Sequence, residues 1–546
     1  MTHFQTLDYI IFVAYAVLIL SVGLWVSRTK KGHKKNAQDY FLAGKSLPFW
    51  AIGASLIAAN ISAEQFIGMS GSGFAIGLAI ASYEWMAAIT LIIVAKYLMP
   101  IFIKQGLYTI PQFVEQRFNT NLKTILAVFW ICLFIFVNLT SVLFLGAKAL
   151  DTILGAGDGS MIMPFIIGLA LFAAAYSIWG GLSAVAWTDV IQVVLLVIGG
   201  FITTIIALHY VTPDGGVFAG LDHVYSVAGE KFNMILKRDN PEFMNLPGIA
   251  VLIGGMWVAN LYYWGFNQYI IQRALAAKSL REAQRGLAFA AFLKLLLPLF
   301  VVIPGIIAYV MFTQPEGTSV IPGIRGDFLH ADGSINYDIS YPWLIKTFIP
   351  TGLKGLVVAA LSAAIVSSLA SMLNSTATIF TMDVYKPYFS KRTDGTDLVP
   401  VGRIAVFVAL VIAVLIAPVL QTMPQMFQYI QEYTGVVSPG ILAVFMMGLF
   451  WKKTTTKGAI IGVLASIPIA ILLKVLPAEL PFLDQMMYTC LLTMATIVMV
   501  SLTTAKTEDD PKAIPLPRET FITGKNFNIS AYVILMILAV LYTLFW

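Results

Sequence analysis

Long apolar runs recur along the whole sequence, and they constrain its fold more than any other feature. A helix needs about 20 apolar residues to cross the hydrocarbon core of a bilayer. Fourteen runs meet that requirement, at residues 8–28, 49–77, 79–103, 123–152, 161–178, 186–210, 249–272, 286–313, 352–385, 401–420, 425–450, 458–475, 480–503 and 528–546. The sequence therefore predicts an all-α, polytopic membrane protein with about 14 transmembrane helices.

The composition excludes a soluble protein. Hydrophobic residues make up 59% of the chain and charged residues 11%, against about 25% charged in ordinary soluble domains. No loop between the runs is long enough for a soluble domain. The net charge of +6 comes from basic residues in short loops, which indicates a topology signal and no nucleic-acid partner.

The distribution of basic residues predicts the orientation. Alternate loops on one side carry 24 of the 34 Lys and Arg residues, at 28–45, 104–123, 273–285, 386–403, 452–457 and 506–525. The opposite side has two long loops, 211–248 and 314–350, with far fewer. Because basic loops stay in the cytoplasm, both termini are expected outside. We interpret the chain as a multi-pass membrane protein with both ends outside; the family resemblance described below implies a bacterial inner membrane, with periplasmic ends.

The order of the runs indicates an internal repeat. Runs two to six and seven to eleven form two sets of five, and an odd number makes the second set cross the membrane in the opposite sense. The expected segments are a first helix with a basic loop (1–48), a first five-helix repeat (49–210), an external loop (211–248), a second, inverted repeat (249–450, with external loop 314–350) and three C-terminal helices (451–546).

Polar interruptions stand at matching places in the two sets. The first helix of the first set contains residues 60–65 (NISAEQ), and that of the second set contains residues 254–260 (GGMWVAN) followed by aromatic residues. Interrupted helices in corresponding positions are the best pointer to a transporter's binding site. In the second set, Tyr262, Tyr263 and Trp264 lie beside Asn260 and Asn267, which favours a ligand surface over simple packing. Rings could stack on the C–H face of a sugar while amides bind its hydroxyls.

Charged residues inside the runs mark candidate functional positions, because lipid disfavours them by at least about 2.5–3.5 kcal/mol each. These are Glu64, Glu84, Asp189 and Lys294, with a structural Glu84–Lys294 pair as the alternative. Lys96 and Arg273 lie near cytoplasmic ends of the runs and are interpreted as snorkelling side chains.

Adjacent serines in the ninth run indicate a cation site. Small residues such as Ala363, Ala364 and Ala370 are explained by close helix packing. Ser367 and Ser368 are explained less well, because neighbours on a helix cannot both face one partner. Two hydroxyls beside the carbonyls of a broken helix would suit sodium. Packing remains the alternative.

Several motifs together resemble the sodium:solute symporter family, over essentially the whole chain. They are residues 41–46 (FLAGKS), 58–61 (AANI), 179–192 (WGGLSAVAWTDVIQ), 374–375 (NS) and 382–383 (MD). With residues 263–264 (YW), 272–273 (QR) and 294–295 (KL), the chain is most similar to the sodium/glucose cotransporter branch. The resemblance implies a LeuT-type inverted repeat and sodium-coupled symport of a neutral hexose such as galactose or glucose by alternating access.

The resemblance also implies roles for individual residues. Sodium would be bound by Ala58, Ile61, Ala364, Ser367 and Ser368, with Asp189 on its path. The sugar would be bound by Gln65, Glu84, Asn260, Lys294 and Gln431, with Asn60 at the edge. The gates would be Tyr263 on the inner side, with Trp264 beside it, and Met69, Tyr83 and Phe427 on the outer side. Ala364 departs from relatives with serine there, which implies one sodium per sugar.

The alternatives are a sodium-coupled symporter of an amino acid or another small organic solute, an ion channel, and a membrane-embedded enzyme. A channel would need a symmetric filter or charged ring, and no companion motif supports an enzyme. The chain is thus expected to be a transporter without catalytic activity. Its partners would be sodium as the co-transported ion, a small neutral sugar and the lipid bilayer. No organic cofactor, ATP or obligate protein partner is implied.

Overall fold

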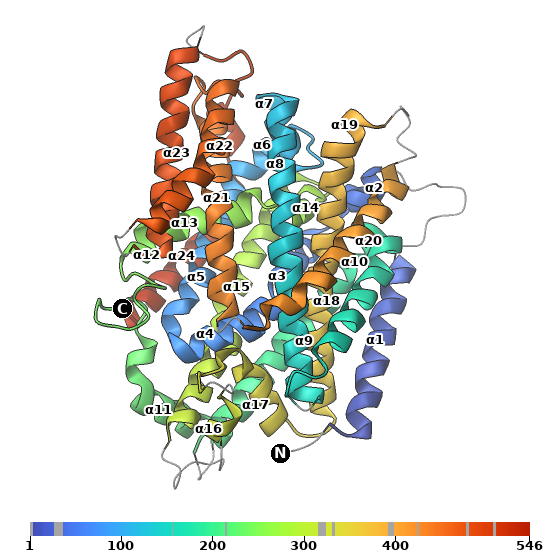
Figure 1. Ribbon diagram of the computed structural model, residues 1–546, viewed down its shortest axis with the longest axis vertical. Coiled ribbons are helices and arrows are strands. Elements are labelled where there is room, and N and C mark those ends of the chain that lie inside the picture. The colour runs from blue at the N-terminus through green and yellow to red at the C-terminus, as the bar shows by residue number, and fades with distance from the viewer. Residues whose placement is uncertain are drawn as a thin grey trace.

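The computed structural model describes residues 4–26, 37–155, 157–212, 216–314, 324–329, 333–390, 398–422, 425–476, 480–505 and 509–546, which form a bundle of helices (Figure 1). The α-helices are α1 (Thr6–Val26), α2 (Ala37–Phe41), α3 (Phe49–Asn60), α4 (Ser70–Ala75), α5 (Ser82–Ile93), α6 (Met99–Lys104), α7 (Ile110–Arg117), α8 (Thr120–Leu133), α9 (Thr140–Leu154), α10 (Ile162–Tyr210), α11 (Val217–Ala228), α12 (Ala250–Ile253), α13 (Gly255–Leu261), α14 (Gln268–Leu275), α15 (Leu280–Thr313), α16 (Ile324–Asp327), α17 (Ser340–Phe348), α18 (Leu353–Ile379), α19 (Lys386–Tyr388), α20 (Leu398–Ile416), α21 (Met426–Phe450), α22 (Thr456–Val475), α23 (Phe482–Thr504) and α24 (Lys525–Leu544). The predicted all-α class is confirmed.

Within these residues, 11 helices are long and apolar enough to cross a membrane, so the predicted count of 14 is not confirmed. The other three runs are shorter or broken. Residues Phe49–Asn60 and Ile162–Ala175 form apolar helices of fewer than 18 residues. The run at 249–272 is divided among α12, α13, a π-helical segment and α14.

Helix α10 contains two of the predicted runs, 161–178 and 186–210. A straight helix of its 49 residues would be roughly 73 Å long, more than twice the hydrocarbon thickness. The two parts instead contact the same stretch of α18. Ser177 donates a hydrogen bond to the Ala370 carbonyl, and Asp189 accepts one from Ser367. Ser177 and Asp189 are thus 12 residues apart in α10, whereas the residues that they contact, Ala370 and Ser367, are only three apart in α18. Helix α10 therefore folds back on itself.

Both helices with polar interruptions are broken at the expected places. Helix α3 ends at Asn60, and Ile61 takes an extended backbone with φ −75° and ψ 91°. A π-helical segment, Glu64–Met69, follows before α4. In the second set, the π-helical segment Tyr262–Phe266 is separated from α14 by Asn267, which is extended at φ −83° and ψ 121°. Each break leaves backbone carbonyls without partners in their own helix.

Glycines bring α15 against the broken helix. A Cβ on Gly286 would lie 2.8 Å from Ile52 of α3, and one on Gly305 would lie 2.0 Å from the Ser70 carbonyl of α4. In a membrane, small residues allow this backbone approach and so increase van der Waals contact. The close packing holds the polar break of α3 against the middle of α15.

Contacts at the chain ends test the predicted sidedness. Asp8 accepts hydrogen bonds from the Gly352 and Gly355 amides, beside the loop 314–350. The Phe545 carbonyl accepts one from Met234 in the loop 211–248. Both termini therefore lie on the side of the two long loops. Lys and Arg 28–35 of the first basic loop lie outside the described residues.

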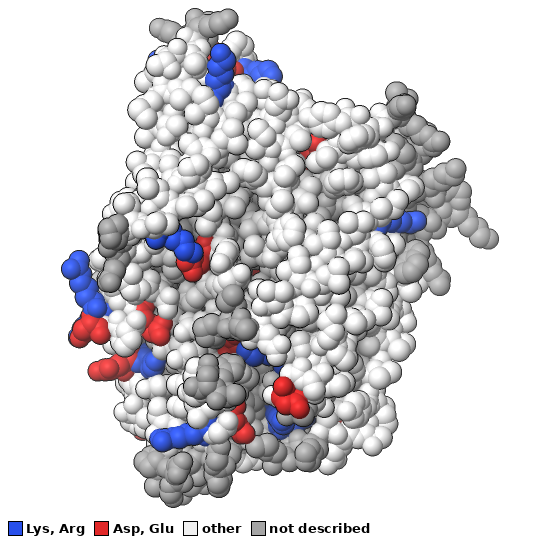
Figure 2. All heavy atoms as spheres, viewed as in Figure 1, with Lys and Arg blue, Asp and Glu red and all other residues white. Residues whose placement is uncertain are grey.

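The opposite side gathers loops that are basic in the sequence. Arg117 pairs with Asp510 at 3.3 Å, and Lys512 donates to the Phe118 carbonyl at 2.5 Å. Between the two sides, the face shown in Figure 2 is mostly uncharged, and most of its charged residues lie toward the ends and the edges. That distribution is typical of a protein surrounded by hydrocarbon.

Candidate functional site

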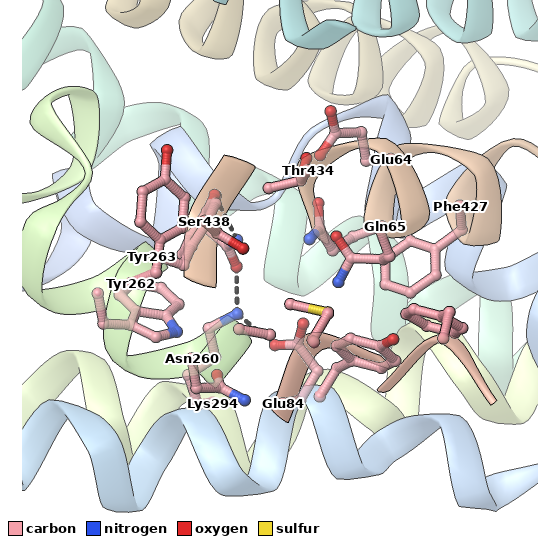
Figure 3. Close-up of a pocket in the computed structure, with 17 residues that line it drawn as sticks. Glu64, Gln65, Glu84, Asn260, Tyr262, Tyr263, Lys294, Phe427, Thr434 and Ser438 are labelled. Carbon is pink, nitrogen blue, oxygen red and sulfur yellow. Dashed lines mark hydrogen bonds and ion pairs between the residues drawn. The ribbon is translucent and has the colours of Figure 1, made fainter. Parts of the chain in front are cut away.

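A cavity of about 60 Å³ lies where the two broken helices meet α5, α15 and α21 (Figure 3). Its walls combine polar side chains with aromatic rings. In Figure 3, Tyr262 and Tyr263 border one end, Phe427 borders the other, and Gln65 lies across the cavity from Asn260 and Glu84. The lining residues are Asn60, Glu64, Gln65, Tyr83, Glu84, Ala259, Asn260, Tyr262, Tyr263, Trp264, Lys294, Phe427, Gln431, Thr434, Ser438, Phe482 and Met486.

A buried ion pair lies at the base of this cavity. The Lys294 ammonium contacts the Glu84 carboxylate and the Asn60 side-chain oxygen. It also lies 4.8 Å from the centre of the Trp264 ring, within cation–π range. Lys294 is 1% exposed and Glu84 2% exposed, so each charge depends on the other for compensation. The pair leaves carboxylate and amide oxygens beside the cavity as acceptors for hydroxyl groups.

Aromatic side chains close the cavity at both ends. The Asn60 amide donates to the Tyr263 hydroxyl at 2.9 Å, and the hydroxyls of Tyr263 and Tyr269 are 2.5 Å apart. At the other end, the rings of Tyr83 and Phe427 pack edge to face with centroids 5.2 Å apart. The cavity is therefore enclosed on two sides by residues from different helices.

The break in α3 also exposes carbonyls to the serines of α18. The Ser368 hydroxyl donates to the Ala59 carbonyl at 2.9 Å and lies 3.5 Å from the Ala58 carbonyl. The Ser367 hydroxyl donates to Asp189. Ala58 and Ser368 are both fully buried, so their oxygens are shielded from solvent between the two helices. Such a group of oxygens suits a hard monovalent cation.

Arg273 is buried beside these serines, so the prediction that it snorkels to the cytoplasmic interface is wrong. It is 0% exposed and donates to Ser55 at 2.6 Å, to Ser371 and to the Tyr269 carbonyl, while it pairs with Asp189 at 3.3 Å. Short, polar Ser55 and Ser371 leave room for the guanidinium between α3 and α18. We call Arg273, Asp189, Ser55 and Ser371 the arginine cluster.

Most residues predicted for the sugar site and its gates line the cavity. These are Asn60, Gln65, Glu84, Asn260, Lys294, Gln431, Tyr83, Tyr263, Trp264 and Phe427. Met69 does not line it and is buried in the core instead. The prediction also left Glu64 unassigned and missed Thr434 and Ser438. Both could have been found from Phe427 and Gln431, because the four residues recur along one face of α21 at helical spacing.

Another buried carboxyl lies near the long loops. Asp338 accepts a hydrogen bond from the Met426 amide, at the start of α21, and pairs with Lys148 of α9 at 3.7 Å. Burial raises the pKa of Asp338 from 3.8 to about 6, and the Lys148 charge offsets this only in part. Asp338 therefore ties the loop before α17 to two helices of the bundle.

This contact predicts a pH dependence of stability. Between about pH 4 and 6 the folded protein retains a proton that an exposed Asp338 would lose, so stability falls as pH rises through that window and is constant above it. Over this pH window, we expect the free energy of unfolding of the parent to fall by about 1–3 kcal/mol relative to that of Asp338→Asn, whose neutral amide removes the titration. Thermal unfolding of both proteins from pH 4 to 8 measures the difference. Parallel pH profiles would contradict the assignment.

Comparisons with known proteins agree with this geometry. The model of the sodium:solute symporter family matches residues 40–466. The chain is 64% identical to the sodium/glucose cotransporter of Vibrio parahaemolyticus, covering 99% of this chain and 98% of that protein. It is 36% identical to the sodium/myo-inositol cotransporter 2 of Mus musculus, covering 84% of this chain and 68% of that one.

Among solved structures, the chain resembles a sodium-coupled sialic acid symporter in an outward-open state. The TM-score is 0.76 at 23% identity, with 92% of this chain and 98% of the other covered. That likeness concerns the fold alone, and it confirms the predicted LeuT-type architecture.

Proposed function

The chain belongs to the sodium:solute symporter family, and from that membership we propose that it couples sodium entry to the uptake of a neutral hexose such as galactose or glucose. It is a secondary active transporter that works by alternating access, and no enzymatic activity is involved. The observation that carries the choice of substrate is the polar and aromatic cavity with its neutralised ion pair. We further propose one sodium per sugar and a bacterial inner membrane, with both termini on the periplasmic side.

The cavity chemistry supports a neutral polyol. Gln65, Asn260 and Gln431 offer amide donors and acceptors, and Glu84 offers acceptors, to hydroxyl groups. Among the described residues that line the cavity, Lys294 is the only cation, and Glu84 already neutralises it. An amino acid would need a free positive charge or a free helix N-terminus for its carboxylate, and no second cation lines the described part of this cavity. The lining therefore favours a sugar over a zwitterion.

The serines of α18 support the proposed sodium site. Ala58 and Ile61 lie at the end of α3, where carbonyls lose their helical partners, and the Ser368 hydroxyl approaches from α18, with Ser367 next to it in the sequence. With the Ala364 carbonyl they would replace the hydration shell of sodium. Asp189 accepts a hydrogen bond from the Ser367 hydroxyl and so lies next to a proposed sodium ligand. It would act on the path of the ion without binding it directly.

Transport should be electrogenic. A potential of 100 mV supplies about 2.3 kcal/mol per charge, so one sodium could concentrate a neutral sugar roughly fortyfold from voltage alone. The experiment is uptake and counterflow of labelled galactose in proteoliposomes, with and without sodium and at imposed potentials. Inside-negative voltage should accelerate uptake at fixed sodium. Uptake that is independent of sodium or of voltage would refute the proposed coupling.

Replacing Ser368 with alanine should weaken sodium binding while the fold is retained. Alanine is smaller and favours helices, so the packing of α18 against α3 persists, but one oxygen of about five is lost. We expect the sodium concentration for half-maximal uptake to rise at least about tenfold, and sugar affinity at limiting sodium to fall with it, because coupling is reciprocal.

The matched control is Ser466→Ala in α22, which also removes a buried hydroxyl, one that donates to the Val463 carbonyl at 2.7 Å. Its sodium dependence should equal that of the parent. If Ser368→Ala also leaves the sodium titration unchanged in well-folded protein, Ser368 only packs, and the sodium site must be elsewhere.

A further inference from the structure

A second cavity, of about 410 Å³, lies between α1, α9, α10 and α18, away from the proposed transport site. In Figure 1, α1 stands at the edge of the bundle beside these helices. Apolar side chains form almost all of its wall, and none of its lining residues is charged. An engineered apolar cavity of about 150 Å³ stays free of water and binds apolar solutes, so a cavity of this size and chemistry calls for an apolar occupant.

The dimensions of this cavity match one leaflet of a bilayer. On α1 it is lined from Tyr9 through Phe12 and Ala16 to Ile19. From Tyr9 to Ile19, ten residues further along, the helix advances about 15 Å, which is half of the roughly 30 Å hydrocarbon thickness. The Tyr9 end lies next to Asp8, which binds the Gly352 amide on the side of the long loops. The cavity thus runs from that membrane surface to about the bilayer centre.

The cavity can be entered sideways from lipid. The outer face of α1 is exposed, with Ile10 60% and Val17 57% accessible. On the facing helix, Gly168 of α10 lines the cavity, and no atom lies within 4 Å of the position its Cβ would take. A hydrocarbon chain therefore meets no side chain at this point between α1 and α10.

Two hydroxyls in the wall lack partners. Tyr15 is 7% exposed and Ser362 is 8% exposed, and neither side-chain oxygen has a hydrogen-bond partner. An unsatisfied hydroxyl is costly in hydrocarbon, where water cannot replace the partner. Side chains on a helix lean toward its N-terminus, which directs the Tyr15 hydroxyl toward the membrane surface. An occupant with an acceptor oxygen near that surface would satisfy it.

We propose that this cavity binds one acyl chain of a diacyl glycerophospholipid from the leaflet on the side of the termini, with the Tyr15 hydroxyl donating to an ester carbonyl. The lipid supplies both required properties, an apolar chain of leaflet length and an acceptor at its upper end. Val366 of α18 lines the cavity, and the next residue, Ser367, belongs to the proposed sodium site. The lipid site itself does not depend on the proposed function. Only an effect of the bound lipid on sodium binding would depend on it.

The experiment fills the cavity and measures retained lipid. The full-length protein is extracted from liposomes of phosphatidylethanolamine and phosphatidylglycerol and analysed by native mass spectrometry. The parent and Gly168→Ala should retain one phospholipid, since a methyl group takes up little of the cavity. Gly168→Leu should reduce retention at least about tenfold. Tyr15→Phe should weaken it about five- to tenfold, the effect of one lost hydrogen bond.

A phospholipid with a photoreactive acyl chain locates the binding. Labels should concentrate on the cavity-lining residues of α1 and α10 in the parent, and Gly168→Leu should remove them. If Gly168→Leu does not fold, Ala16→Leu fills the cavity from the opposite wall. Equal retention in the filled variant, or labels spread evenly over lipid-exposed helices, would overturn the proposal. A retained mass of detergent, quinone or sterol in place of phospholipid would overturn it as well.

Discussion

Replacing Lys294 with methionine should abolish sodium-driven sugar uptake and lower the stability of the folded protein by about 3–5 kcal/mol. Methionine is close to lysine in length but leaves the Glu84 carboxylate, 2% exposed, without a cation. It also removes the contacts of the ammonium with Asn60 and the Trp264 ring. The measurements are galactose uptake in proteoliposomes and thermal unfolding in detergent.

The double variant Glu84→Gln with Lys294→Met separates a structural pair from a binding role. Removing both charges should restore most of the lost stability, because no isolated buried charge remains. Uptake should stay lost if the pair contacts sugar, and it should return if the pair is only structural. Lys474→Met is the matched control: Lys474 pairs with Glu432 at 2.7 Å but is 45% exposed, so its loss should cost no more than about 1 kcal/mol. Normal uptake by Lys294→Met would exclude the proposed site.

Replacing Arg273 with glutamine should have an effect of similar size. The guanidinium is fully buried, and Ser55, Ser371 and Asp189 all depend on it for hydrogen bonds or charge compensation. We expect a loss of about 3–5 kcal/mol of stability and of sodium-dependent uptake. Adding Asp189→Asn should recover stability, because a neutral amide then replaces the buried carboxylate that has lost its cation. Thermal unfolding and sodium titrations measure both effects.

The control for this variant is Arg285→Gln, at a surface pair with Glu282. That pair is 3.5 Å long and Arg285 is 43% exposed, so its loss should change stability by less than about 1 kcal/mol. If Arg273→Gln unfolds at the temperature of the Arg285 variant, the arginine cluster does not hold the helices together.

The sequence predicted the helical fold and most of the cavity because a bilayer requires long apolar helices and disfavours polar side chains that face lipid. Polar residues within an apolar run, such as Gln65 and Glu84, must face protein, and breaks at matching places concentrate them at one site. Arg273 was misread for a related reason. A snorkelling side chain and a buried one can lie equally far from the end of an apolar run, so position in the run does not distinguish the two. What distinguishes them is the ion pair of Arg273 with Asp189, which is distant in the sequence.

Other features could not be predicted from local patterns. Met69 and Phe427 both belong to the predicted outer gate, but only Phe427 reaches the cavity, because its position depends on how α21 packs against Gly68. The separation of α10 into two crossings depends on contacts of Ser177 and Asp189 with α18. The large cavity beside α1 arises from space left between four helices, which no sequence pattern records.

The polar break of α3 has a consequence for how the protein is made. Asn60 meets Lys294 across 234 residues of sequence, and Ser368 meets Ala59 across 309. At about 5–20 residues per second, a ribosome needs roughly 10–50 s to supply Lys294 after Asn60 has emerged. During that time the segment has neither its partners nor a favourable place in lipid. Biogenesis must therefore keep it at the insertion machinery or at the bilayer surface until α15 arrives.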